Sequence, residues 1–428
     1  MKIGWVICPM LWLGRPALAA DPPEVAPEEG VAETVTGRKA APLKASTTVT
    51  FPPVPQIKAL QGMSYEQLGK LPHPTSAYSG AQALKMDVAL IAGIQQGVEL
   101  VYRRQYNQAI AHFHGLEKTW PNTALGPVSE ALVWQARMLE NFDFRYDVEY
   151  AAAAKRAKAG LEAAVKIPGN EAWEHFLLAA VVGVDSIHTM RKGSYLSALQ
   201  DAFSAMDHIQ KANALAPDFA DLKIADGMYN YWRSVVTLSS NLLPDFSDRR
   251  SEGVAQMQLV EARGVFLGPA ATLALAFTWL EEGNLKNALS CLQTNRRSYP
   301  DNVVNNLLVG STYLYMKKVP NALAMFDEVL ADDPSNRRAH YWKGVAYQTS
   351  LEWEKAGTEY KTYLNSEYME KYQKSAAFFR LGQTYHHLKR FDEAEVSWKS
   401  AAGIDGNERA KAALNRLEQA RKAGKVPD

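Results

Sequence analysis

The sequence predicts an all-α fold of stacked helical hairpins, on three observations. From residue 85 onward, proline and glycine become sparse, and apolar residues recur at three and four positions, the spacing of amphipathic α-helices. Small residues and alanines recur at a constant separation along the chain. The 428 residues are 47% hydrophobic and 22% charged, which is normal for a folded protein and long enough for a repeat array.

The first twenty residues, MKIGWVICPMLWLGRPALAA, have the pattern of a secretory signal peptide. Lys2 supplies the positive start, residues 3–14 form a short apolar stretch, and Ala17-Leu18-Ala19 is an A-x-A cleavage motif. The apolar stretch is too short to cross a bilayer, which needs roughly 20 residues, so we expect no integral membrane segment. We expect cleavage near Ala19 or Ala20 and export to the periplasm or cell envelope, with an uncleaved anchor as the alternative.

Residues 21–84 are predicted to form a disordered tether rich in proline and alanine. Stretches such as DPPEVAPEEG and FPPVPQ offer too little apolar surface to offset the conformational entropy that folding removes. Within this range, Ser64 to Leu71 favours one or two helical turns.

The chain has two cysteines, Cys8 in the predicted signal peptide and Cys291. A single mature thiol cannot form an internal disulfide, so the fold depends on its apolar core.

A hairpin repeat is clearest from residue 269 onward. A small residue in each first helix precedes an alanine in the second helix by 12 positions, in the pairs Ala276 and Ala288, Gly310 and Ala322, Gly344 and Ala356, and Gly382 and Ala394. Successive units are offset by 34, 34 and 38 residues, and a period near 34 fits two helices of about a dozen residues plus two turns. The same frame occurs earlier as Gly97, Ala109 and Pro121.

We expect each small residue to lie opposite the alanine of its hairpin, so that the two helix axes approach closely. Aromatic residues should fill the seam, namely Tyr313, Tyr347 and Tyr385 in the first helices and Phe326, Tyr360 and Trp398 in the second. The acidic stretch LAMFDEVLADDPSN at 323–336 is then the end of a second helix before Pro334, with Asp327 and Glu328 on its outer face. It is not predicted to be a metal or acid–base site.

These units resemble the tetratricopeptide repeat family, strongly over 269–408 and well over 90–123. The resemblance implies a right-handed superhelical solenoid of tetratricopeptide-like helical hairpins with a concave inner wall. One departure is that Thr272, Asn306, His340 and Phe378 replace the large aromatic residue often found at the fourth position of the first helix. We expect degenerate repeats over 85–268 (units near 90–123, 124–170, 171–219 and 220–268), regular repeats over 269–408 (269–302, 303–336, 337–374 and 375–408), and a capping helix and tail over 409–428.

The sequence contains no recognisable motif for catalysis or for binding a cofactor. H-E-x-x-H, the phosphate loop, G-x-S-x-G and the dinucleotide-binding glycine pattern are all missing. Asp185 and His188 share a helix face and form the best local metal pair, but two ligands do not make a site. A formal net charge of +1 gives no basic field for nucleic acid. We expect no enzymatic activity, no cofactor, no metal and no nucleic acid partner.

The stretch ADGMYNYWRSV at 225–235 has two interpretations. Its aromatic residues crowd into about a turn and a half before a predicted long loop over 238–250. They form either an aromatic binding edge beside that loop or, as we favour, the core of an enlarged hairpin with Met228, Tyr231 and Trp232 packed inward.

In the tetratricopeptide family, first helices line the concave wall and bind peptides or partner helices. The resemblance places nine partner-binding candidates on that wall: Leu307, Leu314, Arg338, Tyr341, Gln348, Phe379, Arg380, Gln383 and His386. Tyr341, Phe379 and Arg380 are the strongest, because aromatic and arginine residues dominate interface energetics. The family's carboxylate clamp is missing, so we expect a hydrophobic helix or an extended segment as the ligand.

The expected function is therefore an exported, non-catalytic scaffold that binds a partner protein or peptide, in envelope assembly or secretion. Two alternatives stand beside it. A module that binds an envelope glycan such as peptidoglycan is supported by 19 tyrosines and 10 tryptophans, and it should place exposed aromatic residues on one rim. A repeat scaffold with a grafted enzymatic site is the other alternative, and it needs converging polar residues.

Overall fold

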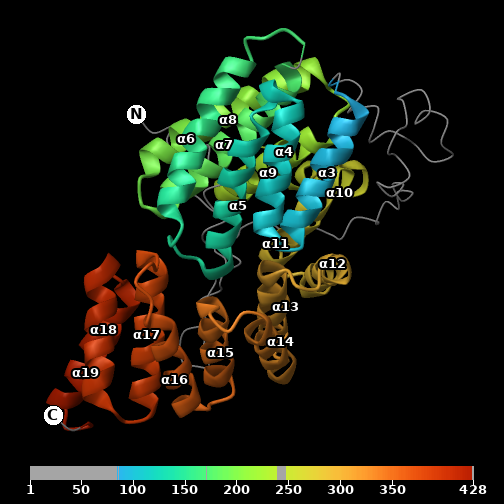
Figure 1. The fold of residues 1–428 in the computed structure, drawn as a ribbon. Helices are drawn as coiled ribbons and strands as arrows, with labels where there is room; N and C mark the ends of the chain where they lie inside the picture. The colour runs from blue at the N-terminus through green and yellow to red at the C-terminus, as the bar shows by residue number, and fades with distance from the viewer. Residues whose placement is uncertain (1–83, 85, 170, 239–246, 427–428) are drawn as a thin grey trace. The chain divides into compact units, whose positions relative to one another are not determined.

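The computed structural model describes residue 84 and residues 86–169, 171–238 and 247–426, and the helices of this part of the chain are shown in Figure 1. Seventeen α-helices and no strand lie within these residues, so the predicted all-α class is confirmed. The predicted signal peptide, nearly all of the tether and its helical turn at Ser64 to Leu71 lie outside the described residues.

Consecutive helices follow one another as hairpins along the chain. Their bounds are α3 (Val88–Tyr102) and α4 (Tyr106–Thr119), α5 (Leu125–Asn141) and α6 (Asp147–Ala164), α7 (Glu171–Arg191) and α8 (Tyr195–Leu215), α9 (Lys223–Leu238) and α10 (Arg250–Arg263), α11 (Gly268–Glu281) and α12 (Leu285–Ser298), α13 (Val303–Tyr315) and α14 (Val319–Asp332), α15 (Arg337–Thr349) and α16 (Trp353–Leu364), α17 (Lys371–His387) and α18 (Phe391–Asp405), and α19 (Glu408–Lys422). Two short 3₁₀ helices, Pro121–Thr123 and Ala220–Leu222, lead into α5 and α9.

The chain forms two compact units. The first contains the described residues up to 136 together with Tyr146–Asn302, and the second contains Arg137–Arg145 together with the described residues from Val303 onward. Each unit has its own apolar core. Trp173, Phe176 and Phe266 anchor the largest cluster of the first unit, and Phe326 and Trp342 stack in the second.

Six hairpins share one turn geometry, in which three residues join the helices and the middle one has a positive φ. These middle residues are Arg104, Gly193, Gly283, Lys317, Leu351 and Lys389, with φ between 58° and 89°. The left-handed conformation costs a residue with a Cβ roughly 1–2 kcal/mol, and only two of the six are glycine. The repeated feature is therefore the conformation of the backbone turn. At four of the six turns the middle residue is not glycine, so the sequence does not predict this conformation.

The seam of four hairpins is formed by a glycine and an aromatic ring that follows it by 16 positions. The pairs are Gly97 and Phe113, Gly310 and Phe326, Gly344 and Tyr360, and Gly382 and Trp398. A Cβ added at these glycines would lie 2.3 to 2.7 Å from the nearest ring atom. We expected the alanines to face the glycines. The alanines are buried, but the ring supplies the atoms nearest to each glycine.

Replacing Gly344 with alanine is expected to lower the free energy of unfolding by about 1–3 kcal/mol, because the added methyl group overlaps the ring of Tyr360. At an open helical site the same change should stabilise the protein by roughly 1 kcal/mol. Gly403 on α18 has no atom within 4 Å of an added Cβ, so Gly403→Ala is the matched control. Denaturant melts of both variants provide the measurement, and a gain in stability for Gly344→Ala would contradict the proposed seam.

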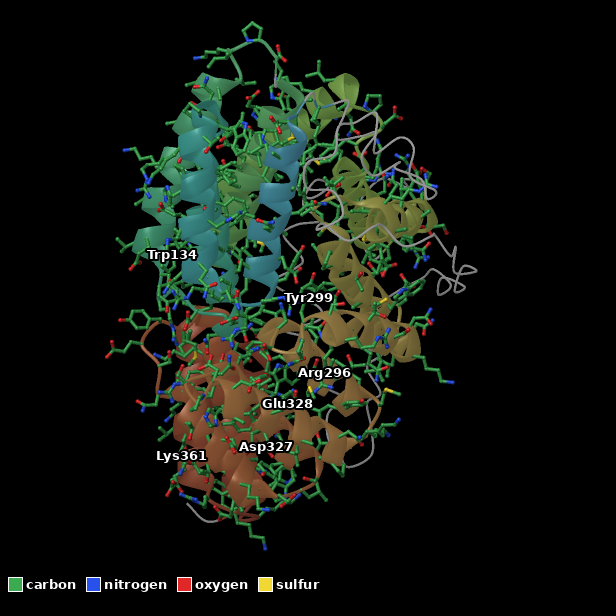
Figure 2. The ribbon with its side chains drawn as sticks, turned by 45° about the vertical axis from the view of Figure 1, so that its right-hand side comes forward. Trp134, Arg296, Tyr299, Asp327, Glu328 and Lys361 are labelled. Atoms are coloured by element: carbon green, nitrogen blue, oxygen red, sulfur yellow. The ribbon has the colours of Figure 1, made fainter. Side chains whose placement is uncertain are left out.

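The acidic stretch at 323–336 is a helix end, as predicted. Helix α14 ends at Asp332, and the Asn336 side chain accepts the Ala339 N–H at the start of α15. Asp327 and Glu328 come from α14 (Figure 2), and the Lys343 ammonium lies 2.9 Å from the Asp327 carboxylate on the outside of the hairpins.

Candidate functional site

The nine predicted wall residues lie on the first helices α13, α15 and α17 of the second unit. Seven of them are buried, namely Leu307, Leu314, Arg338, Tyr341, Gln348, Phe379 and Arg380. Gln383 is half-buried and His386 is exposed. Direct contact with a partner is therefore restricted to Gln383 and His386 in this conformation, and the partner-binding role of all nine stays a prediction.

Five of the nine residues lie in one connected network of polar groups and rings. The Arg380 guanidinium donates to the Tyr341 hydroxyl at 3.3 Å and to the Gln348 side-chain oxygen at 3.1 Å. The Gln348 amide then donates to the Gln383 side-chain oxygen at 3.5 Å. Arg338 joins through its guanidinium, which lies 4.9 Å from the centre of the Tyr341 ring. Networks of this kind fix side-chain orientations, so the accessible Gln383 is held by buried partners.

A segment of the same unit covers Arg338. The Phe142 ring centre lies 5.0 Å from the Arg338 guanidinium. The same guanidinium donates a hydrogen bond to the Gln373 side-chain oxygen at 2.5 Å. The Asn141 side chain accepts the Arg337 N–H at 2.8 Å, at the first residue of α15. In this conformation Phe142 therefore lies over the Arg338 guanidinium, and the predicted wall role of Arg338 stays a prediction.

The covering segment Arg137–Arg145 is fixed by backbone bonds as well as by Phe142. Asp143 forms an isolated bridge with Met369, and the Phe144 N–H donates to the Tyr368 carbonyl at 3.0 Å. The Arg145 guanidinium lies 2.8 Å from the Asp143 carboxylate. The contacts with Met369 and Tyr368 join residues more than 200 positions apart, which explains why the periodicity of one helix did not reveal them.

Leu307, Leu314 and Phe379 are members of the apolar core of the second unit. Their assignment to an open wall came from repeat position alone, and burial against neighbouring helices overrides it. His386 differs because its ring is exposed and lies 5.4 Å from the Phe391 ring and 5.6 Å from the Trp398 ring. An accessible aromatic surface therefore exists at the C-terminal end of α17.

The aromatic stretch of α9 divides between the two predicted interpretations. Tyr231 and Trp232 are buried in a core cluster with Val254 and Met257, as the favoured interpretation requires. Met228 is half-buried and also packs against this cluster, and together with the half-buried Tyr229 it lines a pocket. Residues 239–246 of the predicted loop lie outside the described residues.

The pocket beside Tyr229 is an apolar cavity of about 110 Å³ within the first unit. Its lining comes from α7, α8, α9 and the residue before α11: Phe176, Ala179, Ala180, Ala202, Ala205, Met206, Ile209, Ile224, Ala225, Met228, Tyr229 and Leu267. Five of these residues are alanines, whose small side chains leave the space open. Empty apolar cavities of similar size take up small apolar groups, so this cavity suits one aliphatic side chain.

A sequence comparison matches part of the second unit to a known repeat family. Residues 308–368 match the tetratricopeptide repeat family. The match covers most of α13 and all of α14, α15 and α16, which contain two of the four glycine–ring pairs and the network residues Arg338, Tyr341 and Gln348. No curated protein sequence matches the chain.

Solved structures of tetratricopeptide-type folds are similar to the chain over most of its length. The human IFIT1 dimer with m7Gppp-AAAA has a TM-score of 0.52 at 14% identity and covers 82% of this chain and 87% of that chain. The human IFIT1 dimer with PPP-AAAA has the same TM-score and identity and covers 86% and 92%. The APC/C hetero-tetramer Cut9-Hcn1 matches at a TM-score of 0.38 with 13% identity, covering 81% and 87%. At such identity the IFIT1 similarity shows the fold, and the predicted solenoid of tetratricopeptide-like hairpins is confirmed.

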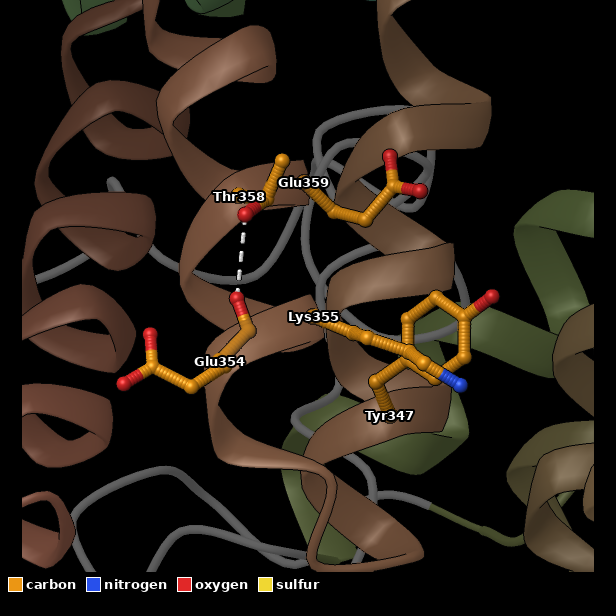
Figure 3. A pocket seen from close by; sticks show the side chains of 5 residues that line it. All are labelled: Tyr347, Glu354, Lys355, Thr358 and Glu359. Atoms are coloured by element: carbon orange, nitrogen blue, oxygen red, sulfur yellow. Dashed lines mark hydrogen bonds between the residues drawn. The ribbon is translucent and has the colours of Figure 1, made fainter.

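A second hollow lies on the outside of the tetratricopeptide hairpin α15–α16 (Figure 3). It is a shallow space of about 240 Å³ lined by Tyr347, Glu354, Lys355, Thr358 and Glu359. The Lys355 ammonium lies 5.3 Å from the centre of the Tyr347 ring, and the Thr358 hydroxyl donates to the Glu354 carbonyl at 3.0 Å. Charges of both signs and an open shape make it a solvated surface feature.

The best sequence candidate for a metal pair has other partners. The Asp185 carboxylate accepts from the Tyr150 hydroxyl at 3.0 Å and pairs with Lys158, whereas His188 contacts Asp147 at 2.6 Å. Within the described ranges, no group of three or more His, Cys, Asp or Glu side chains could hold a metal ion. Burial, with a contribution from Glu261, raises the pKa of the Cys291 thiol to about 12, which disfavours the reactive thiolate.

Helix α7 contains a buried acid, Glu174, which is 2% exposed. Burial and the nearby Glu171 raise its pKa from 4.5 to about 7, and among the described atoms its Oε2 has no hydrogen-bond partner. In the unfolded chain this carboxyl loses its proton at a lower pH than in the folded chain. Stability should therefore fall as pH rises from about 4.5 to about 7, and the loss should remain above that range.

Replacing Glu174 with glutamine is expected to stabilise the protein at pH 8 by up to about 3 kcal/mol, with little change at pH 4. The physical reason is that glutamine has the same shape and no charge to bury. Glu162→Gln, at an exposed position of α6, is the control. Denaturant unfolding at several pH values checks this, and an equal effect at pH 4 and pH 8 would contradict the titration of Glu174.

None of the described helices combines the length and the apolar content that a bilayer-spanning segment needs.

Proposed function

We propose that the chain is an exported, non-catalytic tetratricopeptide scaffold that binds a partner protein or peptide on the wall formed by α15 and α17. The observation that carries this proposal is the network from Arg380 through Gln348 to Gln383, inside and beside the region that matches the family. Buried arginine, tyrosine and glutamine groups hold an accessible edge at Gln383 and His386. Such pre-ordered surfaces lose little side-chain entropy on binding.

The chemistry of this edge favours a protein ligand with an apolar or extended segment. The His386 ring lies against Phe391 and Trp398, and Gln383 offers an amide to a backbone or polar side chain. The titles of the IFIT1 structures name m7Gppp-AAAA and PPP-AAAA as their ligands. We do not carry these ligands over, because a formal net charge of +1 provides no basic field for phosphates.

A role in envelope assembly or secretion follows from the predicted signal peptide. If export occurs, the mature chain should begin near Asp21 in the envelope fraction, which N-terminal sequencing would show.

The decisive experiment is a crosslinking pull-down from the native cell with the full chain as bait. The wall variant combines Gln383→Ala and His386→Ala, because these side chains are accessible and their loss should not disturb the core. The control variant combines Glu354→Ala and Lys361→Ala, at exposed positions of α16. A captured protein is then purified, and its affinity is measured directly against all three baits.

We expect the wall variant to bind the partner roughly tenfold more weakly than the unsubstituted chain does, a loss of about 1.4 kcal/mol. The control variant should bind with the affinity of the unsubstituted chain. Equal binding by both variants would place the partner on another surface. Retention of cell-wall polysaccharide without any protein would replace the scaffold proposal with glycan binding.

A further inference from the structure

Helix α8 of the first unit carries an exposed apolar strip. Leu196, Leu199, Phe203 and Met206 follow one another at intervals of three, four and three residues, which places them along one side of the helix. Leu196 is 80% exposed and Phe203 is 43% exposed. Contiguous exposed apolar side chains of this kind mark a surface that another element covers.

The strip lies on the same helix as Ala202, Ala205 and Met206, which line the apolar cavity, and we treat the strip and the cavity together as one groove. Met206 belongs to both, and the opposite rim is made by Ile224, Met228 and Tyr229 of α9. We call this surface, from Leu196 to Met206 on α8 and from Ile224 to Tyr229 on α9, the α8–α9 groove. Its methionines and small alanines suit an apolar helix that inserts one aliphatic side chain.

The described chain begins in a core cluster that also contributes residues to the cavity. Leu84 and Met86 are buried in the same core cluster as Phe176 and Ala225, which line the cavity. The preceding chain therefore departs from the cluster that lies under the groove. Residues 72–83 are twelve in number and can span about 40 Å when extended, so a segment that precedes them is not confined to the immediate surroundings of Leu84.

Residues 57–71, IKALQGMSYEQLGKL, have the pattern of a matching helix. On an α-helix the apolar residues Ile57, Leu60, Leu68 and Leu71 fall within an arc of about 80°, and Lys58 and Lys70 fall outside it. Because this segment is tethered to the first unit, its effective concentration at the groove exceeds that of a free partner or a second copy.

We propose that residues 57–71 of the chain dock as an amphipathic helix in the α8–α9 groove and insert a leucine into the cavity. The segment is an intramolecular ligand of the first unit, and any protein that uses the groove must first displace it. This inference does not depend on the wall formed by α15 and α17, so the two proposals can fail separately.

Hydrogen–deuterium exchange on the full chain tests the docking. The release variant combines Leu60→Asp, Leu68→Asp and Leu71→Asp, outside the repeat fold, and the control combines Lys58→Asp and Lys70→Asp on the polar side of the same segment. We expect about tenfold faster exchange at 196–209 and 224–229 in the release variant, equivalent to about 1.4 kcal/mol of docking, and no change in the control. Conversely, Phe203→Asp on the rim should speed exchange within 57–71.

Unchanged exchange at 196–209 in the release variant overturns the proposal, as does an equal effect of the control. Protection of α8 that depends on protein concentration and survives the release substitutions also overturns it, because a second copy then covers the groove. Faster exchange in both reciprocal variants at every concentration supports the intramolecular helix.

Discussion

Replacing Asp221 with alanine should lower the free energy of unfolding of the first unit by about 3–5 kcal/mol, since it would leave buried amide groups without an acceptor. The carboxylate accepts the N–H groups of Val265, Phe266 and Leu267 at 2.7 to 2.8 Å and is itself fully buried. One side chain thus fixes the connection between α10 and α11. Each unsatisfied buried amide costs roughly 1–3 kcal/mol.

Two further substitutions make this prediction specific. Asp221→Asn retains one acceptor oxygen and should lose less stability than Asp221→Ala. Asp218→Ala, three residues earlier at an exposed position, should change stability by less than about 0.5 kcal/mol. Thermal and denaturant unfolding of the three variants would check the order. A loss at Asp218 equal to that at Asp221 would mean that the hydrogen bonds are not the cause.

The sequence was sufficient for the fold class and for the seam rings Phe326, Tyr360 and Trp398, but it predicted alanines rather than rings as the partners of the glycines. A glycine–ring pair such as Gly344 and Tyr360 recurs because the two helices of each hairpin pack in the same way. A contact within one hairpin recurs at the repeat period, so it is visible in the sequence. The turns left a weaker trace. Leu351 and Lys317 have the positive φ that Gly283 has, but neither residue type predicts a positive φ from the sequence.

The candidate site could be predicted only in part, for a different reason. Tyr341, Gln348 and Arg380 lie together because neighbouring first helices present equivalent positions to one another, and their predicted role in partner binding stays a prediction. Repeat position could not show that Phe142 covers Arg338, since that contact comes from a connecting segment with no repeat. The α8–α9 groove was also missed. Its strip at Leu196 and Phe203 has ordinary helical spacing, and only the structure shows that this side of α8 is exposed.

The second large effect is expected at the ion pair between Arg250 and Glu282, whose side chains are 2% and 1% exposed. The Arg250 guanidinium donates to both Glu282 oxygens at 3.1 and 3.2 Å, and the Tyr231 hydroxyl donates to the same carboxylate at 2.7 Å. Removing one partner of a buried pair leaves an uncompensated charge. Arg250→Met is therefore expected to destabilise the first unit by about 3–5 kcal/mol, as measured by denaturant unfolding.

Combining Arg250→Met with Glu282→Leu should recover much of that loss, because apolar residues of similar volume can replace a buried pair at little cost. The comparison matters for the groove, since Tyr231 lies on α9, two residues from Tyr229 at the rim. If the ion pair fixes α9, Arg250→Met should also speed exchange at 224–229, and the double variant should restore it. Additive losses in Arg250→Met and Glu282→Leu measured singly would show that the charges act separately and that the ion pair does not fix α9.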